Sequence, residues 1–449
     1  MILKNLHLKN FRRFETLDIG FDEKLTVIVA HNGQGKTSIL EAIIAGLGPF
    51  VGAFDNGRSP HIDAQDARYA VTGPHGQNEQ QFPVEISGEI RLESQPVHWK
   101  RERAGVKGRS TVKDAVNLKN YGKELQSRLR TDEGAILPLI AYYSSERLWK
   151  SRQLSSASKK SLTGSRTLGY ADCLGRSSTF KQMEQWLHDA TLTVLQDRQE
   201  PEFTQTRLEA QLQGIQHAVN SIVRTEGWGY FRYSMKHRSL TLRHDDHGEL
   251  PLSLLSDGLR ATVTLAADMA FRCAHLNPAL GIEASQRTSG IVMIDEIGLH
   301  LHPGWQQRIL ISLQEAFPSI QFVVTTHSPQ ILSSVPSASV RVIQRDETSD
   351  TPAFQVVTPT VEIEGRSSDH ALLEAFGVDP LPPSEWSERY NELLNLPESN
   401  VARFQTLRNE LAEHFGEDHV WVQEADRIQR LRAMRTRLKA QQAAHTHHA

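Results

Sequence analysis

A short loop between an apolar strand and a helix constrains the fold of this chain more than any other feature. The loop lies in the segment IVAHNGQGKTSILEA, residues 28–42. The residues before it, Lys24 to Ala30, are β-branched and mostly apolar, which is typical of a buried strand. The residues after it carry apolar side chains at helical spacing until Gly48 and Pro49. A glycine-containing loop that enters a helix presents backbone amides to an anion, so the segment predicts an α/β sheet with a phosphate site.

The loop matches the phosphate-binding pattern G-x-x-x-x-G-K-[ST] at every fixed position except the first, where Ala30 stands. Alanine is tolerated there if its φ is negative, since only a positive φ demands glycine. In this pattern backbone amides surround the phosphates of a nucleotide such as ATP, the lysine reaches the terminal phosphates and the hydroxyl binds Mg²⁺. The candidate nucleotide-binding residues are Asn32, Gly33, Gln34, Gly35, Lys36, Thr37 and Ser38. The alternative is a glycine-rich turn that binds nothing.

Two adjacent carboxylates end a second apolar strand. The segment IVMIDE, residues 291–296, has four apolar residues before Asp295 and Glu296. Ligands of open α/β sheets bind at the carboxyl ends of the strands. Asp295 is therefore a candidate Mg²⁺ ligand together with Thr37, and Glu296 is a candidate catalytic base that polarises the attacking water. The alternative is a strand that ends in two solvated acids.

Two further segments place polar residues beside apolar elements. In LLSDGLRATVTLAADMAF, residues 254–271, Ser256, Asp257 and Gly258 precede an apolar helix, so they form either an anion site or an ordinary helix N-cap. In VVTTHSPQIL, residues 323–332, His327 follows an apolar strand. His327 is a candidate catalytic residue, as are Lys36 and Glu296, and the alternative is a structural histidine.

Composition excludes several classes of protein. The 449 residues carry 50 Lys or Arg and 53 Asp or Glu, so a net charge of −3 gives no global attraction to nucleic acid. Two distant cysteines, Cys173 and Cys273, cannot build a disulfide framework. No apolar run approaches the roughly 18 residues that a membrane span needs. We expect a soluble cytoplasmic protein that does not associate with membranes.

The four motifs, in their order along the chain, resemble the ABC-type ATPases, in which LSDG corresponds to the LSxG signature and His327 to the switch histidine. LKNFRRF, residues 8–14, is similar to the start of RecF-like and SMC-like heads, where an arginine matching Arg12 or Arg13 reaches the nucleotide. The resemblance implies an α/β fold: an ABC-type head with a mixed or parallel sheet, an antiparallel ribbon and a helical lobe. It also implies a head-to-tail homodimer or higher oligomer that closes around ATP and Mg²⁺, with Ser256 and Gly258 completing the partner's site.

This resemblance predicts four regions. Residues 1–150 form an N-terminal ATPase lobe with the phosphate loop and a basic ribbon, and residues 151–250 a helical lobe that includes a hairpin at 229–244. Residues 251–345 carry the signature, the acidic pair and His327, and residues 346–449 form a mostly helical appendage. Within the first region, alternating Leu6 and Leu8 predict an edge strand.

DEIGLHLHPGWQ, residues 295–306, resembles a conserved element of the RecF-like ATPases of bacterial defence, although Gly298 replaces its second aspartate. With YYSSERLW and EGRSSDHALLEAFGV it resembles the PtuA family of the Septu anti-phage systems, also found beside some retrons. The resemblance implies slow, regulatory ATP hydrolysis and a partner HNH nuclease like PtuB, acting on DNA or another nucleic acid. The residue equivalent to the Q-loop glutamine is sought among 144–147.

Two other classes remain open: a RecF-like repair ATPase and an OLD-like nuclease with a Toprim domain. VEIEGRSSD, with Glu364, superficially resembles a Toprim start, but no D-x-D pair follows. His300 and His302 form either a metal pair or, as we favour, a loop scaffold. Residues 100–130, with ten Lys or Arg against three Asp or Glu, and RIQRLRAMRTRLK, residues 427–439, are candidate phosphate contacts or solvated faces.

Overall fold

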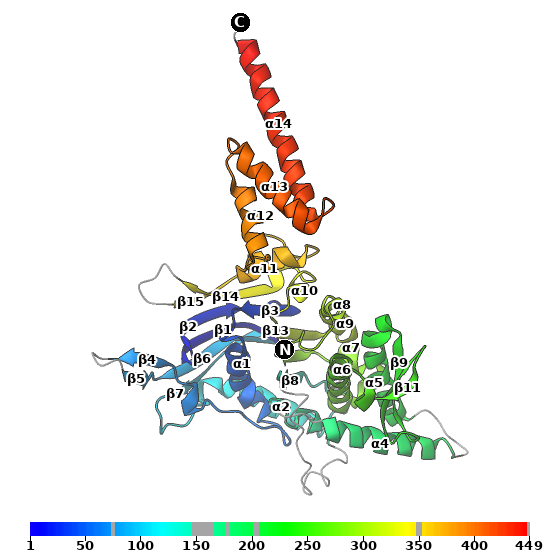
Figure 1. The fold of residues 1–449 in the computed structure, drawn as a ribbon. Helices are drawn as coiled ribbons and strands as arrows, with labels where there is room; N and C mark the ends of the chain where they lie inside the picture. Colours follow the sequence, from blue (N-terminus) through cyan, green and yellow to red (C-terminus); the bar gives the residue numbers. More distant parts are fainter. Residues whose placement is uncertain (73–76, 146–164, 176–179, 201–205, 347–352, 447–449) are drawn as a thin grey trace. The chain divides into compact units, whose positions relative to one another are not determined.

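The computed structural model describes residues 1–72, 77–145, 165–175, 180–200, 206–346 and 353–446 (Figure 1). The chain separates into two compact units, Met1–Gly377 and Val378–Ala449. The finer division into four regions stays a prediction. None of the helices in the described ranges combines the length and the apolarity needed to cross a membrane.

The centre of the first unit is a six-stranded sheet in the order β15-β14-β3-β13-β12-β8. Its strands are β3 (Leu25–Ala30), β8 (Leu139–Tyr143), β12 (Gly290–Ile294), β13 (Ile320–Thr325), β14 (Val340–Asp346) and β15 (Ala353–Val357). All neighbours are parallel except β14 and β15. Because both faces are covered, β3, β8, β12 and β13 are buried along their whole length, which explains why their sequences are mostly apolar.

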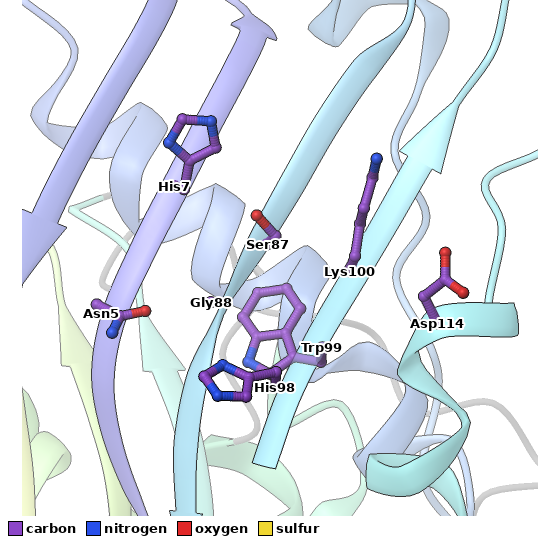
Figure 2. Close-up of a pocket in the computed structure, with 8 residues that line it drawn as sticks. All are labelled: Asn5, His7, Ser87, Gly88, His98, Trp99, Lys100 and Asp114. Carbon is purple, nitrogen blue, oxygen red and sulfur yellow. The ribbon is translucent and has the colours of Figure 1, made fainter. Parts of the chain in front are cut away.

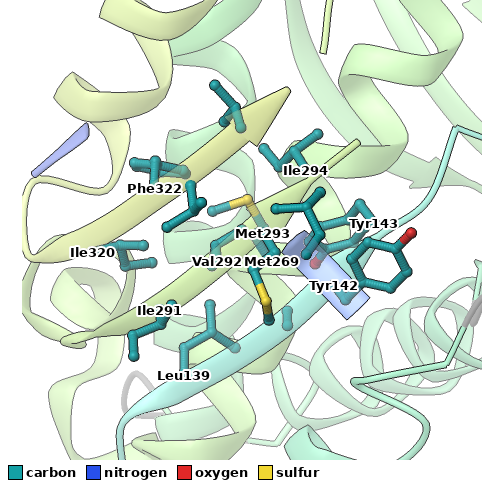
Figure 3. Close-up of a cluster of buried hydrophobic side chains, with 14 of the residues drawn as sticks. Leu139, Tyr142, Tyr143, Met269, Ile291, Val292, Met293, Ile294, Ile320 and Phe322 are labelled. Atoms are coloured by element: carbon teal, nitrogen blue, oxygen red, sulfur yellow. The ribbon is translucent and has the colours of Figure 1, made fainter. Parts of the chain in front are cut away.

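Helices cover this sheet. Contacts join α1 (Lys36–Val51) to β3 and β13, and α6 (Asp257–Leu276) to β8. Figure 3 shows part of the core, in which Met269 of α6 lies with side chains of β8, β12 and β13. Further α-helices of the described residues around this sheet are α7 (Ala284–Arg287), α8 (Pro303–Gln306), α9 (Ile309–Ala316), α10 (Pro329–Leu332) and α11 (Ser368–Phe376). The predicted α/β class with a predominantly parallel sheet is confirmed.

A four-stranded antiparallel sheet, β2-β1-β6-β7, lies on the other side of α1. Its strands are β1 (Ile2–Phe11), β2 (Phe14–Gly20), β6 (Val84–Leu92) and β7 (Gln95–Arg103), and β4 (Tyr69–Thr72) pairs with β5 (Gln77–Gln80) beside it. The expectation that β1 is an edge strand was wrong, because β1 pairs with both β2 and β6. The alternating pattern arises instead from a sheet with one buried and one exposed face.

The outer face of this sheet carries a shallow pocket of about 400 Å³ (Figure 2). Asn5 and His7 come from β1, and Lys100 comes from β7. One basic residue of the stretch 100–130 is buried: Arg101 is fully buried, donates to the Pro60 carbonyl at 2.7 Å, and has a pKa lowered to about 10 by desolvation. Arg101 is therefore structural and not a phosphate contact. The stretch continues into α2 (Val116–Arg128), which packs on α1.

A second group of elements in the same unit consists of α4 (Phe180–Asp197), α5 (Arg207–Val223) and a three-stranded sheet. The sheet has the order β11-β10-β9, with β9 (Trp228–Ser234), β10 (Ser239–His244) and β11 (Gly248–Pro251). The predicted hairpin is confirmed as β9 and β10, and β11 adds a third strand. Contacts between α5 and α6 join this group to the central sheet.

The second unit is helical, with α12 (Glu385–Asn395), α13 (Val401–Phe415) and α14 (Val420–Thr446). It has its own small core, made by Leu393, Phe404, Leu407, Leu411, Val422 and Ala425. The apolar face of α13 is thus buried in this core. The apolar side chains of α14 are only partly buried, since Leu431 and Met434 are exposed.

Candidate functional site

The glycine loop joins β3 to α1 in the way its sequence predicted. Ala30 is the buried last residue of β3, in extended conformation, and pairs with Ile343 of β14, so glycine is not needed there. Gly33 and Gly35 have φ values of 73° and 98°, in the left-handed region. A Cβ on Gly35 would also lie 2.5 Å from Cζ of Phe14. The loop therefore keeps glycine where backbone geometry and packing require it.

The N-terminus of α1 offers uncompensated amides. Its N-cap is Gly35, which has no side chain to accept hydrogen bonds, and the first turn contains no acidic residue. Thr37 lies in this turn and the adjoining Ser38 is buried. Asn32 is exposed, and the Gln34 amide donates to the His31 carbonyl at 3.1 Å. A sixteen-residue helix with an open, positively polarised end favours an anion at this point.

Lys36 places a buried cation at the same end of α1. Its side chain is 6% exposed, its Nζ contacts Nε2 of His327, and Oε1 of Glu296 lies 3.6 Å away. Desolvation lowers the pKa of Lys36, although Glu296 and Asp295 oppose the shift. A buried ammonium group with so little hydration gains strongly from an added anion.

Asp295 links the loop to the strand ends. The Thr37 hydroxyl lies 3.1 Å from both carboxylate oxygens of Asp295, and the Thr325 hydroxyl donates to Oδ1 at 2.7 Å. The Asp295 amide donates to the Tyr143 carbonyl at 2.8 Å, which holds its backbone against β8. Asp295 is only 3% exposed, so its orientation is set by these contacts. The two proposed Mg²⁺ ligands, Thr37 and Asp295, are thus neighbours.

Thr325 is a positioning residue that the sequence analysis missed. Its hydroxyl donates to Asp295 and also accepts the Glu296 amide at 2.9 Å. The only signal in the sequence is a hydroxyl at the carboxyl end of the apolar strand β13, in VVTTHS. Recognising it required knowing that β12 and β13 are adjacent and parallel.

Glu296 follows Asp295 in a left-handed conformation, with φ of 51°. Its side chain is 24% exposed, and Oε1 lies 3.4 Å from Nε2 of His327. Desolvation raises the pKa of Glu296, and Asp295 adds to this effect, while Lys36 opposes it. A carboxylate with a raised pKa is a better proton acceptor near neutral pH.

His327 stands two residues beyond β13, between Lys36 and Glu296. Desolvation, followed by the positive charge of Lys36, lowers the pKa of His327. The imidazole is therefore held in its neutral form, in which one ring nitrogen donates and the other accepts. Lys36, Thr37, Asp295, Glu296 and His327, expected from three distant segments, meet at one edge of the sheet.

The two candidate nucleotide-binding arginines, Arg12 and Arg13, lie in different surroundings. Arg12 donates through Nε to Asp66 at 3.0 Å and forms an ion pair with Glu41, so it is held away from the loop. Arg13 lies beside the loop: a Cβ on Gly33 would stand 3.8 Å from its Nη1. The exposed side chain of Arg13 has its guanidinium 4.7 Å from the Phe354 ring centre. The structure thus brings only Arg13 to the nucleotide loop.

The signature residues lie apart from this cluster. Ser256 caps α6, accepting the Leu259 amide at 3.5 Å, and both Ser256 and Asp257 are exposed. Gly258 is buried, and a Cβ there would lie 2.3 Å from the His300 carbonyl oxygen. Within the described ranges, no hydrogen bond or ion pair links these three residues to the side chains around Lys36.

The segment after Glu296 is a packed scaffold. A Cβ on Gly298 would lie 2.8 Å from Cδ1 of Ile331, so the aspartate of the family pattern does not fit there without a shift. His302 caps α8 through Nδ1, which accepts the Gly304 amide. No metal-binding group of three or more His, Cys, Asp or Glu side chains occurs in the part of the chain that the structure describes. Among the residues sought for the Q-loop, Ser144 is buried, and Glu146 and Arg147 lie outside the described residues.

Comparison with known proteins identifies relatives of this chain. The chain matches an AAA domain family over residues 5–221 and a second one, "AAA domain, putative AbiEii toxin, Type IV TA system", over residues 119–333. It is 25% identical to "Retron Vc95 probable ATPase" of Vibrio cholerae, with 90% of this chain and 84% of the relative covered. It is 21% identical to "Septu protein PtuA" of Bacillus thuringiensis, with 84% and 85% covered.

The chain is an ATPase related to PtuA, and it matches two AAA domain families. Among solved structures, this ATPase is similar to the SMC head domain from Thermotoga maritima, at 17% identity and a TM-score of 0.44, covering 80% of this chain and 100% of that one. The strand order and the position of the phosphate loop, rather than this partial superposition, define the fold of the ATPase.

Proposed function

We propose that the ATPase binds ATP with Mg²⁺ at the edge of the sheet formed by β3, β12 and β13, and hydrolyses it slowly as a switch. The observation that carries the proposal is the Thr37–Asp295 contact at 3.1 Å beside the buried Lys36. A hydroxyl and a carboxylate supply oxygen ligands, which Mg²⁺ prefers, and Mg²⁺ usually takes its other ligands from phosphate and water. The uncapped N-terminus of α1 and the desolvated Lys36 ammonium fit the phosphates.

The side chains around Lys36 have distinct roles in this proposal. Lys36 binds the terminal phosphates and neutralises the charge that develops there. Glu296 orients the attacking water and accepts its proton, which its raised pKa favours. Neutral His327 donates a hydrogen bond to the terminal phosphate. Bound Mg²⁺ would supply charge neutralisation between the phosphates.

The exposed signature loop supports a composite site made by two copies. Ser256 and Asp257 are exposed on one chain and have no contact with its own Lys36 cluster in the described residues. In a head-to-tail dimer, Ser256 and the N-terminus of α6 approach the terminal phosphate bound by the other copy. Neither half is then catalytic alone.

Complementation between two inactive variants tests this arrangement. Lys36→Ala removes the cation of one half-site, and Ser256→Arg fills the other half with a bulky side chain. Each variant alone is expected to be inactive. A mixture regains activity because a mixed dimer contains one intact site, giving about a quarter of wild-type activity for random pairing. No recovery in the mixture, with both variants folded, would refute the shared site but not ATP binding.

We further infer that this cytoplasmic ATPase serves anti-phage defence by controlling a partner HNH nuclease like PtuB, acting on DNA or another nucleic acid. The support is the similarity to PtuA and to a retron ATPase over most of both chains. Expression with and without an adjacent HNH gene tests the inference. Phage protection that needs both genes and an intact Lys36 supports it, whereas cleavage by the purified ATPase alone would indicate an OLD-like nuclease.

A further inference from the structure

A pocket of about 470 Å³ lies between the end of α5 and the sheet of β9 and β10. Its lining includes Arg224, Trp228, Tyr230, Arg243 and Asp245. None of these residues belongs to the ATP site described above. The lining therefore combines aromatic rings with guanidinium groups.

Tyr230 is held at the surface against the preference of its backbone. Its φ is 52°, which is strained for a bulky side chain, and the residue is 69% exposed. The register between β9 and β10 shifts here: Thr241 opposes Arg232, whereas Arg243 opposes Gly229. Such a bulge redirects a side chain, and in this case it turns the ring toward solvent. Neither burial nor regular pairing offsets the strain.

Two arginines that form no ion pair with the described residues line the pocket of Tyr230. The Arg243 guanidinium lies 5.6 Å from the centre of the Tyr230 ring. Neither Arg243 nor Arg224 forms an ion pair with any residue in the described ranges. Trp228 continues the aromatic surface and packs on His244, with ring centres 4.8 Å apart. The one acidic residue in the lining, Asp245, can accept hydrogen bonds from the amino groups of bases.

We propose that this surface binds single-stranded nucleic acid, with one base stacked on Tyr230 and the adjacent phosphates bound by Arg224 and Arg243. An exposed aromatic ring accepts the face of any unpaired base, and arginines bind phosphate in two-point contacts. Bases in a duplex are already stacked, so the surface discriminates against double strands. β11 runs through the turn Leu252–Leu254 into Ser256, which places this surface one short connection from the signature loop.

The test measures binding of a fluorescein-labelled oligo(dT) of about twelve nucleotides by anisotropy, without ATP. Tyr230→Gly removes the ring and also relaxes the positive φ, because glycine adopts it freely. We expect this variant to bind about tenfold more weakly, yet to unfold at the same or a higher temperature. A ring needed only for folding would give the opposite result, a lower unfolding temperature with unchanged binding.

Matched variants complete the experiment. Tyr230→Phe keeps the ring and should bind like the wild type, as should Tyr69→Ala, which removes another exposed tyrosine, 60% exposed on β4. Arg243→Ala should weaken binding, and Lys36→Ala should not, which separates this surface from the ATP site. Absence of oligonucleotide binding at low salt, equal affinity for duplex, or equal competition by free dTMP would overturn the proposal.

Discussion

The two halves of the proposed ATP site differ in how the fold holds them. Lys36 and Asp295 are 6% and 3% exposed and belong to one connected network that includes Thr325 and His327. Ser256 and Asp257 are exposed, and their contacts stay within the first turn of α6. One half is therefore preorganised inside the chain, whereas the other half is presented outward.

The reason lies in the elements that carry each half. The first half sits where parallel strands end together, so the register of β3, β12 and β13 sets the distances between side chains. The second half sits on one helix N-terminus, where the backbone of Gly258 lies close to the His300 carbonyl but the side chains of Ser256 and Asp257 stay exposed. The hydrogen-bond network around Lys36 and Asp295 is thus complete within one chain, whereas the proposed catalytic site also needs Ser256 of a second copy. Variants in the two halves should therefore behave differently.

The largest effect is expected at Glu296. Glu296→Gln removes the proton acceptor but keeps the shape, so ATP hydrolysis should fall about a thousandfold while ATP binding persists. The variant should accumulate as an ATP-bound dimer, detected by size-exclusion chromatography with light scattering. Glu283→Gln, at an exposed carboxylate 56% accessible, serves as the control. If Glu296→Gln elutes only as a monomer in the presence of ATP, the two halves of the site do not join between two chains around ATP.

Lys36→Ala directly tests the half of the site that contains Lys36 and Asp295, called the inner half below. Because the variant removes the cation that binds the terminal phosphates, ATP affinity should fall about a hundredfold, as measured by calorimetry. Lys119→Ala, an exposed lysine on α2, should bind like the wild type. Unchanged affinity in Lys36→Ala would refute the assignment of the loop.

Thr325→Val sharpens the view that the inner half is preorganised. Valine keeps the volume but removes the hydroxyl between Asp295 and the Glu296 amide, so hydrolysis should fall about tenfold and stability by about 1–2 kcal/mol. Thr26→Val is the control, since this fully buried threonine accepts only the Asp22 amide, at 2.9 Å. If both variants lose stability but retain full activity, Thr325 does not position the carboxylates.

The smallest effect concerns pH. The pKa of His327 is lowered in the folded protein, so at high pH both states carry a neutral imidazole and the group contributes no difference. As pH falls below about 6.5, the unfolded chain binds a proton that the folded chain resists, and stability decreases. His327→Gln should therefore lose less stability than the wild type between neutral and mildly acidic pH. Thermal unfolding without nucleotide measures this difference. Parallel curves for variant and wild type would contradict this role of burial.

Sequence alone determined the class of fold and most of the inner half-site. The strand–loop–helix order around Lys36 and the apolar strand before Asp295 are local patterns, and local patterns can be recognised in the sequence without knowledge of the fold. The same holds for the expectation that Ala30 is tolerated, because a strand end needs no positive φ.

Only the tertiary structure decided which arginine reaches the loop, that Thr325 joins two strands, and that Tyr230 is turned outward. Arg12 and Arg13 are adjacent in sequence, and only the positions of Asp66 and Glu41 separate them. Thr325 depends on the pairing of β12 with β13, and Tyr230 on a register shift between β9 and β10. These are contacts between residues distant in sequence, so no local periodicity encodes them.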